Sequence, residues 1–418
     1  MTALAEPAPE PSHGPRVLVL SKSFPNNVFE VLGLWVENLV RHSASFCQPK
    51  VIAPVQYCPP IPALPQYYRR FRSIPRRCRE KGIEVFHPRI LVGPGYSLHS
   101  IESRIYYWAA LRVARRLRHS FPFDLIHAHF TYPDGVAAVW LGKRFGVPVI
   151  ITEQNPWGPW MDEDTAVRRQ TIRAARECTF QIAISRSVRE SIVRLTGESD
   201  KLRVIPDAVD GDVFKLPERD LQPVRNQIIF VGAIRPVKGV DILLRAVRLL
   251  VDSGRDVRLV LIGESYFKNY QREYQRLQGM AVELNIANRV NFAGKKAVDE
   301  LVREIQRSAV LVLPSRAESF GMVLVEALAC GTPVVATRCG GPEDIVTEEV
   351  GILVPPEDPQ ALATGIGRVL DGRDRYDPSR LRAQALERFG LESVGQRLRQ
   401  LYQEALFTAR QPSNPLKS

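Results

Sequence analysis

Short apolar runs alternate along the chain with longer segments in which apolar residues recur at helical spacing. The clearest example is residues 310–341, in which 310–313 are all apolar, as expected of a strand buried on both faces of a parallel sheet. From Phe320 to Cys330 the spacing becomes helical, and Gly331 follows where a helix would end. Residues 332–336 form a second apolar run, so this segment predicts one β-α-β unit.

The same alternation predicts strands and helices over most of the chain. Strands are expected at 16–21, 124–129, 147–152, 179–185, 227–231, 257–263 and 290–292. Helices are expected at 34–42, 101–119, 164–178, 186–196, 241–252, 266–284, 298–308 and 391–407. By contrast, residues 57–100 are rich in proline and arginine and are poorly periodic. The predicted fold class is therefore α/β, with parallel sheets.

A polar, proline-bearing segment at 215–226 divides this pattern into two α/β halves, as an interdomain linker would. We therefore expect two domains, at 16–214 and 227–390, with a cleft between them. A disordered tail is expected at 1–15, and a last helix at 391–410 could cross back to the first domain.

Composition limits the possible partners and compartment. The 418 residues are 45% hydrophobic and 24% charged, as in an ordinary globular protein, but the formal net charge is +12. Such a charge predicts anionic partners, which could be nucleotides, nucleic acid or acidic lipid headgroups. The six cysteines show no C-x-x-C spacing and favour a reducing cytosol over a disulfide framework or a zinc site. No stretch approaches the roughly 18 apolar residues of a spanning helix, so membrane contact is expected to be peripheral.

Basic residues far outnumber acidic ones between residues 69 and 118, where the only acids are Glu80, Glu84 and Glu102. Aromatic residues are interleaved with the arginines. We interpret the region either as a solvated basic face or as a patch for an anionic membrane, with aromatic rings in the headgroup layer. Nucleic acid could use the same mixture, but no helix-turn-helix pattern, zinc spacing or aromatic strand motif accompanies it.

Two carboxylates, Glu318 and Glu326, lie eight residues apart around the start of the predicted helix at 320–330. Parallel sheets bind ligands at the carboxyl ends of their strands, and a helix N-terminus offers free N–H groups to an anion. The helix N-terminus suits a phosphate group, whereas carboxylates suit the hydroxyl groups of a sugar. The two together indicate a ligand that is part phosphate and part sugar.

The segment G-A-I-R-P-V-K-G at 232–239 follows another predicted strand and precedes another helix. Gly232 and Gly239 would let the backbone approach a ligand closely, and Arg235 and Lys238 would add charge-assisted hydrogen bonds to an anion. The spacing matches neither G-x-G-x-x-G nor G-x-x-x-x-G-K-[ST]. Together with the helix start at 320, this loop predicts a diphosphate clamp.

His127 and His129 alternate with Ala128 at the end of a predicted strand, so they point to the same face. His129 is the last residue before the loop and is predicted to bind a polar sugar or phosphate group, whereas His127 is assigned a structural role. Gly33 lies in the first loop after a strand and could approach a ligand closely or could be a plain turn glycine.

These motifs resemble those of the retaining GT-B glycosyltransferases of family four. The resemblance rests on V-G-A-I-R-P-V-K-G at 231–239, the E-x7-E spacing of Glu318 and Glu326, and A-C-G-T-P-V-V-A-T-R-C-G-G at 329–341. I-H-A-H-F and G-I-L-V-P-P-E-D support it, and it covers nearly the whole chain. It implies two Rossmann-like domains that face each other across a cleft, with a nucleotide sugar held by the second and the acceptor by the first. It also implies transfer with retained anomeric configuration, without a metal or a cofactor.

The resemblance also implies roles for residues. Arg235 and Lys238 would bind the donor diphosphate and stabilise the leaving nucleotide, because cations stabilise charge that grows on a departing phosphate. Glu326 would bind the ribose hydroxyls, Glu318 would hold the sugar and diphosphate, and His129 would contact the donor sugar near the reacting carbon. The implied catalytic set is His129, Arg235, Lys238 and Glu318; the implied donor-binding set is Gly232, Arg235, Lys238, Phe320, Gly321, Met322 and Glu326.

The function expected from this resemblance is transfer of a hexose-type sugar from a nucleotide sugar to a saccharide or lipid-linked acceptor, in polysaccharide or glycolipid assembly. The protein is expected in the cytoplasm, where it could attach peripherally to the inner face of the membrane. Two alternatives stay open: a GT-B sugar-nucleotide epimerase or hydrolase, and a basic nucleic-acid-binding protein. Departures from the family pattern, which are P-D-A-V-D at 206–210, Gln154 and Gly263-Glu264-Ser265, concern acceptor and base preference.

Overall fold

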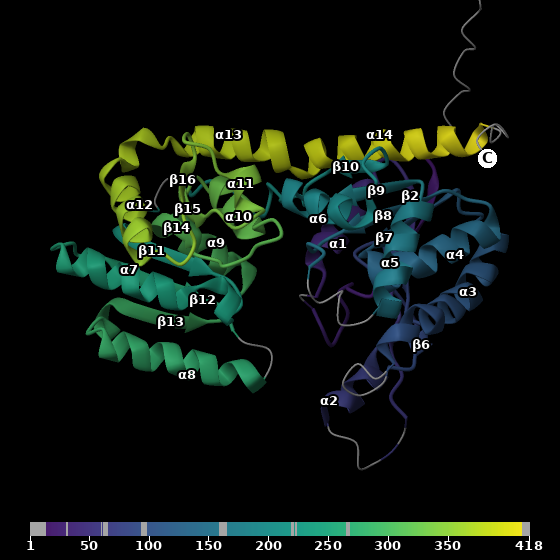
Figure 1. The fold of residues 1–418 in the computed structure, drawn as a ribbon, viewed down its shortest axis with the longest axis horizontal. Coiled ribbons are helices and arrows are strands. Elements are labelled where there is room, and N and C mark those ends of the chain that lie inside the picture. Colours follow the sequence, from purple (N-terminus) through teal and green to yellow (C-terminus); the bar gives the residue numbers. More distant parts are fainter. Residues whose placement is uncertain are drawn as a thin grey trace, which may run out of the picture. The chain divides into compact units, whose positions relative to one another are not determined.

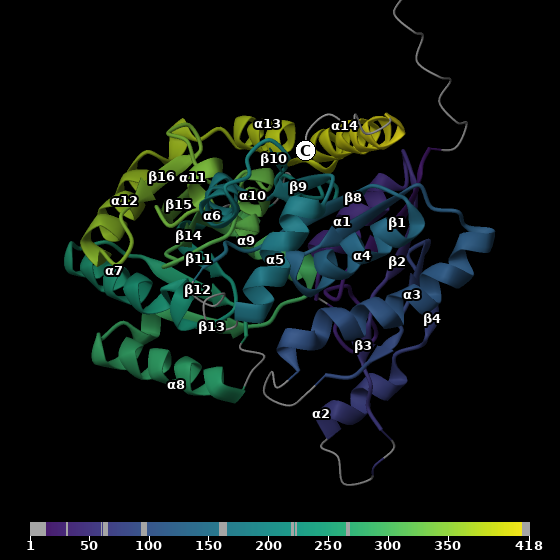
Figure 2. The same cartoon turned by 45° about the vertical axis from the view of Figure 1, so that its right-hand side comes forward.

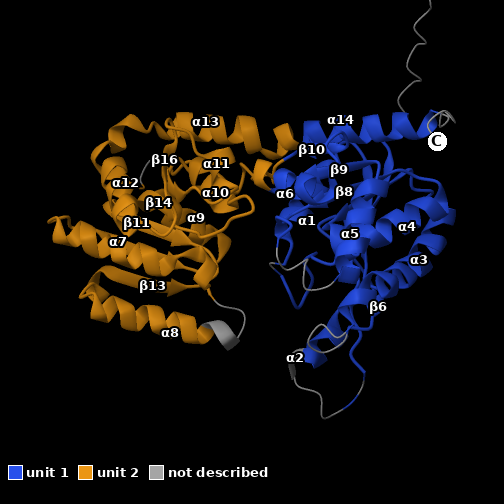
Figure 3. Cartoon of the chain, viewed as in Figure 1, with its two compact units in different colours: residues 1–184, 188–205, 395–418 blue, residues 185–187, 206–394 orange. Residues whose placement is uncertain are grey.

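The chain forms two compact α/β units, distinguished by colour in Figure 3. The computed structural model describes residues 14–30, 32–59, 61, 66–92, 98–158, 165–218, 221, 224–264 and 268–411. The first unit consists of residues 1–184, 188–205 and 395–418, and the second of residues 185–187 and 206–394. The predicted α/β class with parallel sheets is confirmed in both units (Figure 1).

The sheet of the first unit is parallel except for one edge strand. Within the described residues it has eight strands, in the order β10 (Leu202–Val204), β9 (Phe180–Ala183), β8 (Val149–Glu153), β7 (Leu125–His129), β1 (Arg16–Leu20), β2 (Gln48–Ile52), β5 (Ile83–Phe86) and β4 (Arg77–Glu80). β4 pairs antiparallel with β5, and β3 (Val55–Gln56) pairs separately with β6 (Arg89–Ile90). The strand order reverses between β1 and β7, and the carboxyl ends of two such strands are where doubly wound sheets bind ligands.

Helices cover one face of this sheet through a continuous apolar core. They are α3 (Glu102–Ser120), α4 (Val136–Phe145) and α5 (Thr165–Glu177), and Figures 1 and 2 show them together on that side. Ile126 and Ala128 of β7 point into this core, so His127 and His129 point to the opposite face. The other helices that contribute to the unit are α1 (Leu34–Ser43), α2 (Gln66–Arg69), α6 (Arg186–Thr196) and α14 (Leu391–Arg410) from residue 395 onward.

All strands in the sheet of the second unit run parallel. Among the described residues their order is β13 (Val290–Gly294), β12 (Arg258–Ile262), β11 (Val224–Val231), β14 (Ser308–Leu313), β15 (Val334–Thr337) and β16 (Gly351–Val354). Its helices are α7 (Val240–Asp252), α8 (Lys268–Glu283), α9 (Val298–Arg307), α10 (Met322–Ala329), α11 (Pro342–Ile345), α12 (Pro359–Asp371) and α13 (Pro378–Phe389). The order reverses between β11 and β14, so the loops after these two strands, 232–239 and 314–321, meet at a switch point.

One predicted boundary needs correction, and one region without a predicted element contains short strands. β11 begins at Val224, three residues before the predicted strand, because its pairing with β14 extends to Ser308. The poorly periodic region 57–100 contains the β4–β5 hairpin and β6, whose strands are only two to four residues long and too short to show a period. Within the described ranges, no helix is long and apolar enough to cross a membrane.

Candidate active site

Two loops pack against each other at the switch point of the second unit. Gly239 ends the first loop with φ of +65°, and a Cβ there would lie 2.0 Å from the carbonyl oxygen of Pro314 in the second, so only glycine fits. The backbone N–H of Arg316 donates to the Val237 carbonyl at 2.8 Å. The helices that follow these loops are α7 and α10, and the first N–H groups of each lack intrahelical acceptors.

Lys238 and Glu318, one from each loop, form an ion pair. Lys238 Nζ donates to Glu318 Oε2 at 2.6 Å, and the Ser315 hydroxyl donates to the same oxygen at 3.1 Å. The side chains are 22% and 13% exposed, so the pair lies partly shielded from water. The structure thus brings two predicted site residues into direct contact: Lys238, assigned to the donor diphosphate, and Glu318, assigned to the sugar and diphosphate.

The other predicted site residues of the 232–239 loop, Arg235 and Gly232, lie in different surroundings. Arg235 is exposed and precedes the short turn Pro236–Lys238. The N–H of Gly232 donates to the Ile262 carbonyl at 3.0 Å and is therefore engaged within the sheet. Of the predicted clamp, the Gly232 N–H is therefore not available to an anion.

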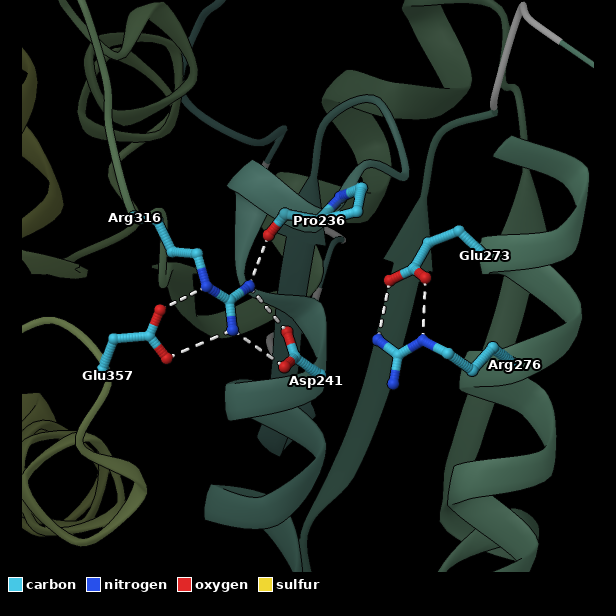
Figure 4. Close-up of polar contacts among 6 residues, drawn as sticks. All are labelled: Pro236, Asp241, Glu273, Arg276, Arg316 and Glu357. Atoms are coloured by element: carbon cyan, nitrogen blue, oxygen red, sulfur yellow. Dashed lines mark hydrogen bonds and ion pairs between the residues drawn. The ribbon is translucent and has the colours of Figure 1, made fainter. Parts of the chain in front are cut away.

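Arg316 joins the two loops and was missed in the sequence analysis. Its guanidinium lies between two carboxylates (Figure 4), with bonds of 2.9 Å to both oxygens of Asp241 and of 3.1 Å to Glu357 Oε2. It also donates to the Pro236 carbonyl, and its hydrogen bonds to Asp241 hold the pKa of Arg316 above its ordinary value. Arg316 therefore fixes the turn that carries Lys238. The only sequence signal was a cation two residues before Glu318.

Glu326 lies one turn into α10, with a carboxylate that has no hydrogen-bond partner among the described residues. It is half-buried by its surroundings, and this burial raises its pKa from the ordinary 4.5 to about 7. Phe320 packs its ring into the core at 5.6 Å from that of Phe389, so only its backbone can face a ligand. Gly321 caps α10, and Met322 is its first residue and half-buried.

In the first unit, His129 ends β7 at the other switch point. Its two ring nitrogens are buried and have no partner within the described part of the chain, and burial lowers its pKa to about 3. The imidazole is therefore neutral at physiological pH. The next residue, Phe130, has φ of +71°, which is strained for an aromatic residue and is typical of functional sites.

His127 stacks on His129, with ring centroids 4.5 Å apart. Its Nδ1 is 2.7 Å from the Tyr402 hydroxyl of α14, and its Nε2 is 2.8 Å from the Thr152 hydroxyl. Burial, with the His129 ring as a smaller contribution, lowers the pKa of His127 well below its ordinary value. His127 thus has the structural role that was predicted for it by residue type and position.

The loop after β1 is held against the His129 loop by Asp134, which the sequence analysis did not select. Asp134 accepts from the Lys22 N–H at 2.5 Å and from the Tyr106 hydroxyl at 3.0 Å. Burial raises its pKa to about 7, and these hydrogen bonds oppose the shift.

Gly33, the N-cap of α1, has φ of +76°, and a Cβ would lie 2.0 Å from the Ser23 carbonyl oxygen. Packing inside the loop thus explains Gly33.

Across the described ranges, no group of three or more histidine, cysteine or acidic side chains could hold a metal ion.

Known proteins resemble both halves of the chain. Residues 215–388 match the family described as glycosyl transferases group 1, and residues 74–213 match glycosyltransferase family 4. A D-inositol 3-phosphate glycosyltransferase from Acidothermus cellulolyticus is 31% identical over 71% of this chain and 71% of its own. This chain is a group 1 glycosyltransferase of the GT-B type. The family resemblance predicted from the motifs is confirmed.

Solved structures place the glycosyltransferase in the GT-B fold. Anabaena HepE in complex with UDP superimposes with a TM-score of 0.73 at 19% identity, over 93% of this chain and 100% of that one. Sucrose-phosphate synthase from Thermosynechococcus elongatus superimposes with a TM-score of 0.75 at 22% identity, over 94% and 100%. The two units are therefore the Rossmann-like domains of a GT-B glycosyltransferase.

Proposed function

We propose that this glycosyltransferase transfers a hexose-type sugar from a nucleotide sugar to a saccharide or lipid-linked acceptor. The supporting observation is the Lys238–Glu318 pair at the switch point of the second unit. The same unit holds the half-buried carboxylate of Glu326, which has no hydrogen-bond partner among the described residues. A nucleotide sugar would offer a diphosphate to Lys238, ribose hydroxyls to Glu326 and sugar hydroxyls to Glu318. The UDP in the HepE structure supports this class of donor.

The proposed chemistry relies on cations and helix termini rather than on a protein nucleophile. Arg235 and Lys238 would stabilise negative charge on the departing diphosphate, as would the free N–H groups of Gly321 and Met322 at the start of α10. Retention of anomeric configuration and independence of metal belong to the proposal through the family resemblance. The contact of His129 with the donor sugar stays a prediction, as does a role in polysaccharide or glycolipid synthesis at the inner face of the cytoplasmic membrane.

A thermal-shift screen across UDP-, GDP- and ADP-sugars tests the donor part of the proposal. Stabilisation by a true ligand grows with its concentration relative to its dissociation constant, so one nucleotide series should raise the Tm of the wild type. Glu326→Ala should lose most of that shift while the protein keeps its fold. Absence of any shift across the series, or an unchanged shift in the variant, would refute the donor site.

Product analysis with the stabilising nucleotide sugar then separates the transferase from its closest alternative. A transferase converts the donor only when an acceptor is added and forms a new glycosidic bond. An epimerase or hydrolase would convert the sugar nucleotide in the absence of any acceptor.

A further inference from the structure

The exposed side of α3 is basic and carries a tryptophan. Arg104, Trp108, Arg112, Arg115 and Arg116 fall within roughly 120° of the helix circumference, at about 100° per residue. All five side chains are exposed, and Trp108 is 59% exposed. The opposite side of α3 packs in the core of the first unit. We call these five residues the α3 face.

Among the described residues, no acid pairs with the arginines of the α3 face. Its four arginines make no ion pair or hydrogen bond with any residue that the structure describes. The single acid of the helix, Glu102, is buried and is engaged by Lys22 and His99. Since adjacent like charges repel, four uncompensated guanidinium groups around an exposed indole need an explanation other than packing.

A cavity of about 390 Å³ adjoins the α3 face between α3, α4 and α5. Its wall is apolar where Val136, Val139 and Trp140 of α4 line it, and basic where Arg104 and Arg169 line it. Arg169 is exposed and, like Arg104, has no partner in the described ranges.

The other charged residues of the cavity are already engaged. Arg173 and Lys143 pair with Glu177 at 2.8 Å each. The cavity therefore offers two uncompensated guanidinium groups above an apolar wall, which suits a phosphate group attached to an apolar body.

We propose that the α3 face docks on an anionic lipid bilayer, with a lipid phosphate against Arg104 and Arg169 in the adjoining cavity. Guanidinium groups pair well with phosphate, and an exposed indole among cations is typical of the interfacial layer of a membrane. A helix laid along the surface presents a long strip to a planar partner, whereas nucleic acid is recognised through grooves or stacked bases. The inference rests on the proposed function only in that a lipid-linked acceptor would be met at such a surface.

Vesicle co-sedimentation with the full chain tests the docking surface. The wild type should bind vesicles of phosphatidylcholine with phosphatidylglycerol, should bind pure phosphatidylcholine weakly, and should be released by added salt. The triple variant Arg112→Glu, Arg115→Glu and Arg116→Glu should lose at least on the order of a hundredfold in partition coefficient. Loss of each basic residue near an anionic surface removes about fivefold, and the added carboxylates are repelled by the surface as well. Trp108→Ala should bind several-fold more weakly than wild type at every salt concentration.

A charge-matched control separates the α3 face from net charge. Arg245, Arg258 and Arg380 of the second unit are exposed, and their triple replacement by Glu changes the formal charge by the same amount. This control should bind vesicles as the wild type does. Equal losses in both triple variants, equal binding to neutral and anionic vesicles, or tight binding to RNA without binding to vesicles would overturn the proposal.

Folding and donor binding are read separately, by circular dichroism and by the thermal shift with nucleotide sugars. A nucleotide-sugar shift without vesicle binding would overturn the docking surface and leave the proposed function intact. Vesicle binding without any nucleotide-sugar shift would support the docking surface and overturn the proposed function.

Discussion

Lys238 Nζ lies 2.6 Å from Glu318 Oε2, so the cation assigned to the donor diphosphate shares its charge with the acid assigned to the donor sugar. Removal of the Lys238 ammonium should therefore lower the affinity for a diphosphate, and removal of the Glu318 charge should raise it. Lys238→Ala should weaken binding of a nucleoside diphosphate about 10- to 100-fold, the usual range for a charge-assisted hydrogen bond. Glu318→Gln should tighten the same binding several-fold, because the ammonium is no longer shared, while the rate of sugar transfer falls.

Isothermal titration with the nucleoside diphosphate and initial-rate measurements with the nucleotide sugar check this pair. Tighter binding in Glu318→Gln could not come from damage to the fold, because such damage would weaken binding in both variants. Weaker binding in Glu318→Gln would contradict the shared-charge interpretation.

Arg316 should control donor affinity without touching the donor. A lysine at this position cannot reach Asp241, Glu357 and the Pro236 carbonyl together, because it lacks the planar fork of five donors. We expect Arg316→Lys to weaken nucleotide-sugar binding about tenfold and to lower the free energy of unfolding by roughly 1–2 kcal/mol. Isothermal titration and urea denaturation measure the two effects.

Arg276→Lys is the matched control. Within the described ranges Arg276 forms its ion pair with Glu273 of α8 (Figure 4), and lysine keeps the positive charge that Arg276 presents to Asp241. A pair with one exposed partner and a charge that lysine keeps should change by only about 0–1 kcal/mol, so both quantities should stay near wild type. Similar losses in the two variants would show that Arg316 has no special position.

Glu326 should make donor binding depend on pH near neutrality. Its pKa of about 7 means that the carboxyl is protonated below that pH and ionised above it. Only the ionised form accepts from both ribose hydroxyls, so affinity should rise about tenfold per pH unit below pH 7 and level off above it. Measurement with an intact nucleotide sugar avoids titration of a terminal phosphate, and Glu326→Gln should remove the slope.

The same shift affects stability with the opposite sign. The unfolded chain ionises Glu326 near pH 4.5 but the folded one near pH 7, so the folded state holds the extra proton and loses stability as pH rises between these values. In the absence of ligand, the free energy of unfolding of Glu326→Gln, measured by urea denaturation, should therefore increase relative to that of the wild type as pH is raised from 4.5 to 7. A constant difference between the two proteins over this range would refute the shift.

Tyr402 should stabilise the first unit through His127. In Tyr402→Phe the buried Nδ1 of His127 loses its 2.7 Å hydrogen bond, which should lower the free energy of unfolding by about 1–3 kcal/mol. Phe407→Leu changes a side chain that is 64% exposed on the same helix and should have almost no effect. Urea denaturation compares the two variants, and equal unfolding curves would contradict a role for the Tyr402 hydrogen bond.

The elements of the fold and the loops of the candidate site could be predicted because both have local signals. Strand β14 is a buried apolar run, and the 232–239 loop has glycines and cations at the start of a helix. The contacts could not be predicted in this way, because they join distant positions. Lys238 and Glu318 are 80 residues apart, and Arg316 meets Asp241 from 75 residues away. Residue type indicated that Lys238 and Glu318 suit a donor, but only the pairing of β11 with β14 places them together.

The hydrogen bond between His127 and Tyr402 also sets an order for biosynthesis. The two residues are 275 positions apart, and a ribosome that adds about 5–20 residues per second needs tens of seconds to pass from one to the other. During that time the second unit is synthesised in full, while strand β7, which carries both histidines, still lacks its contact with α14. The unit that emerges first is therefore completed last, when residues 395–410 leave the ribosome.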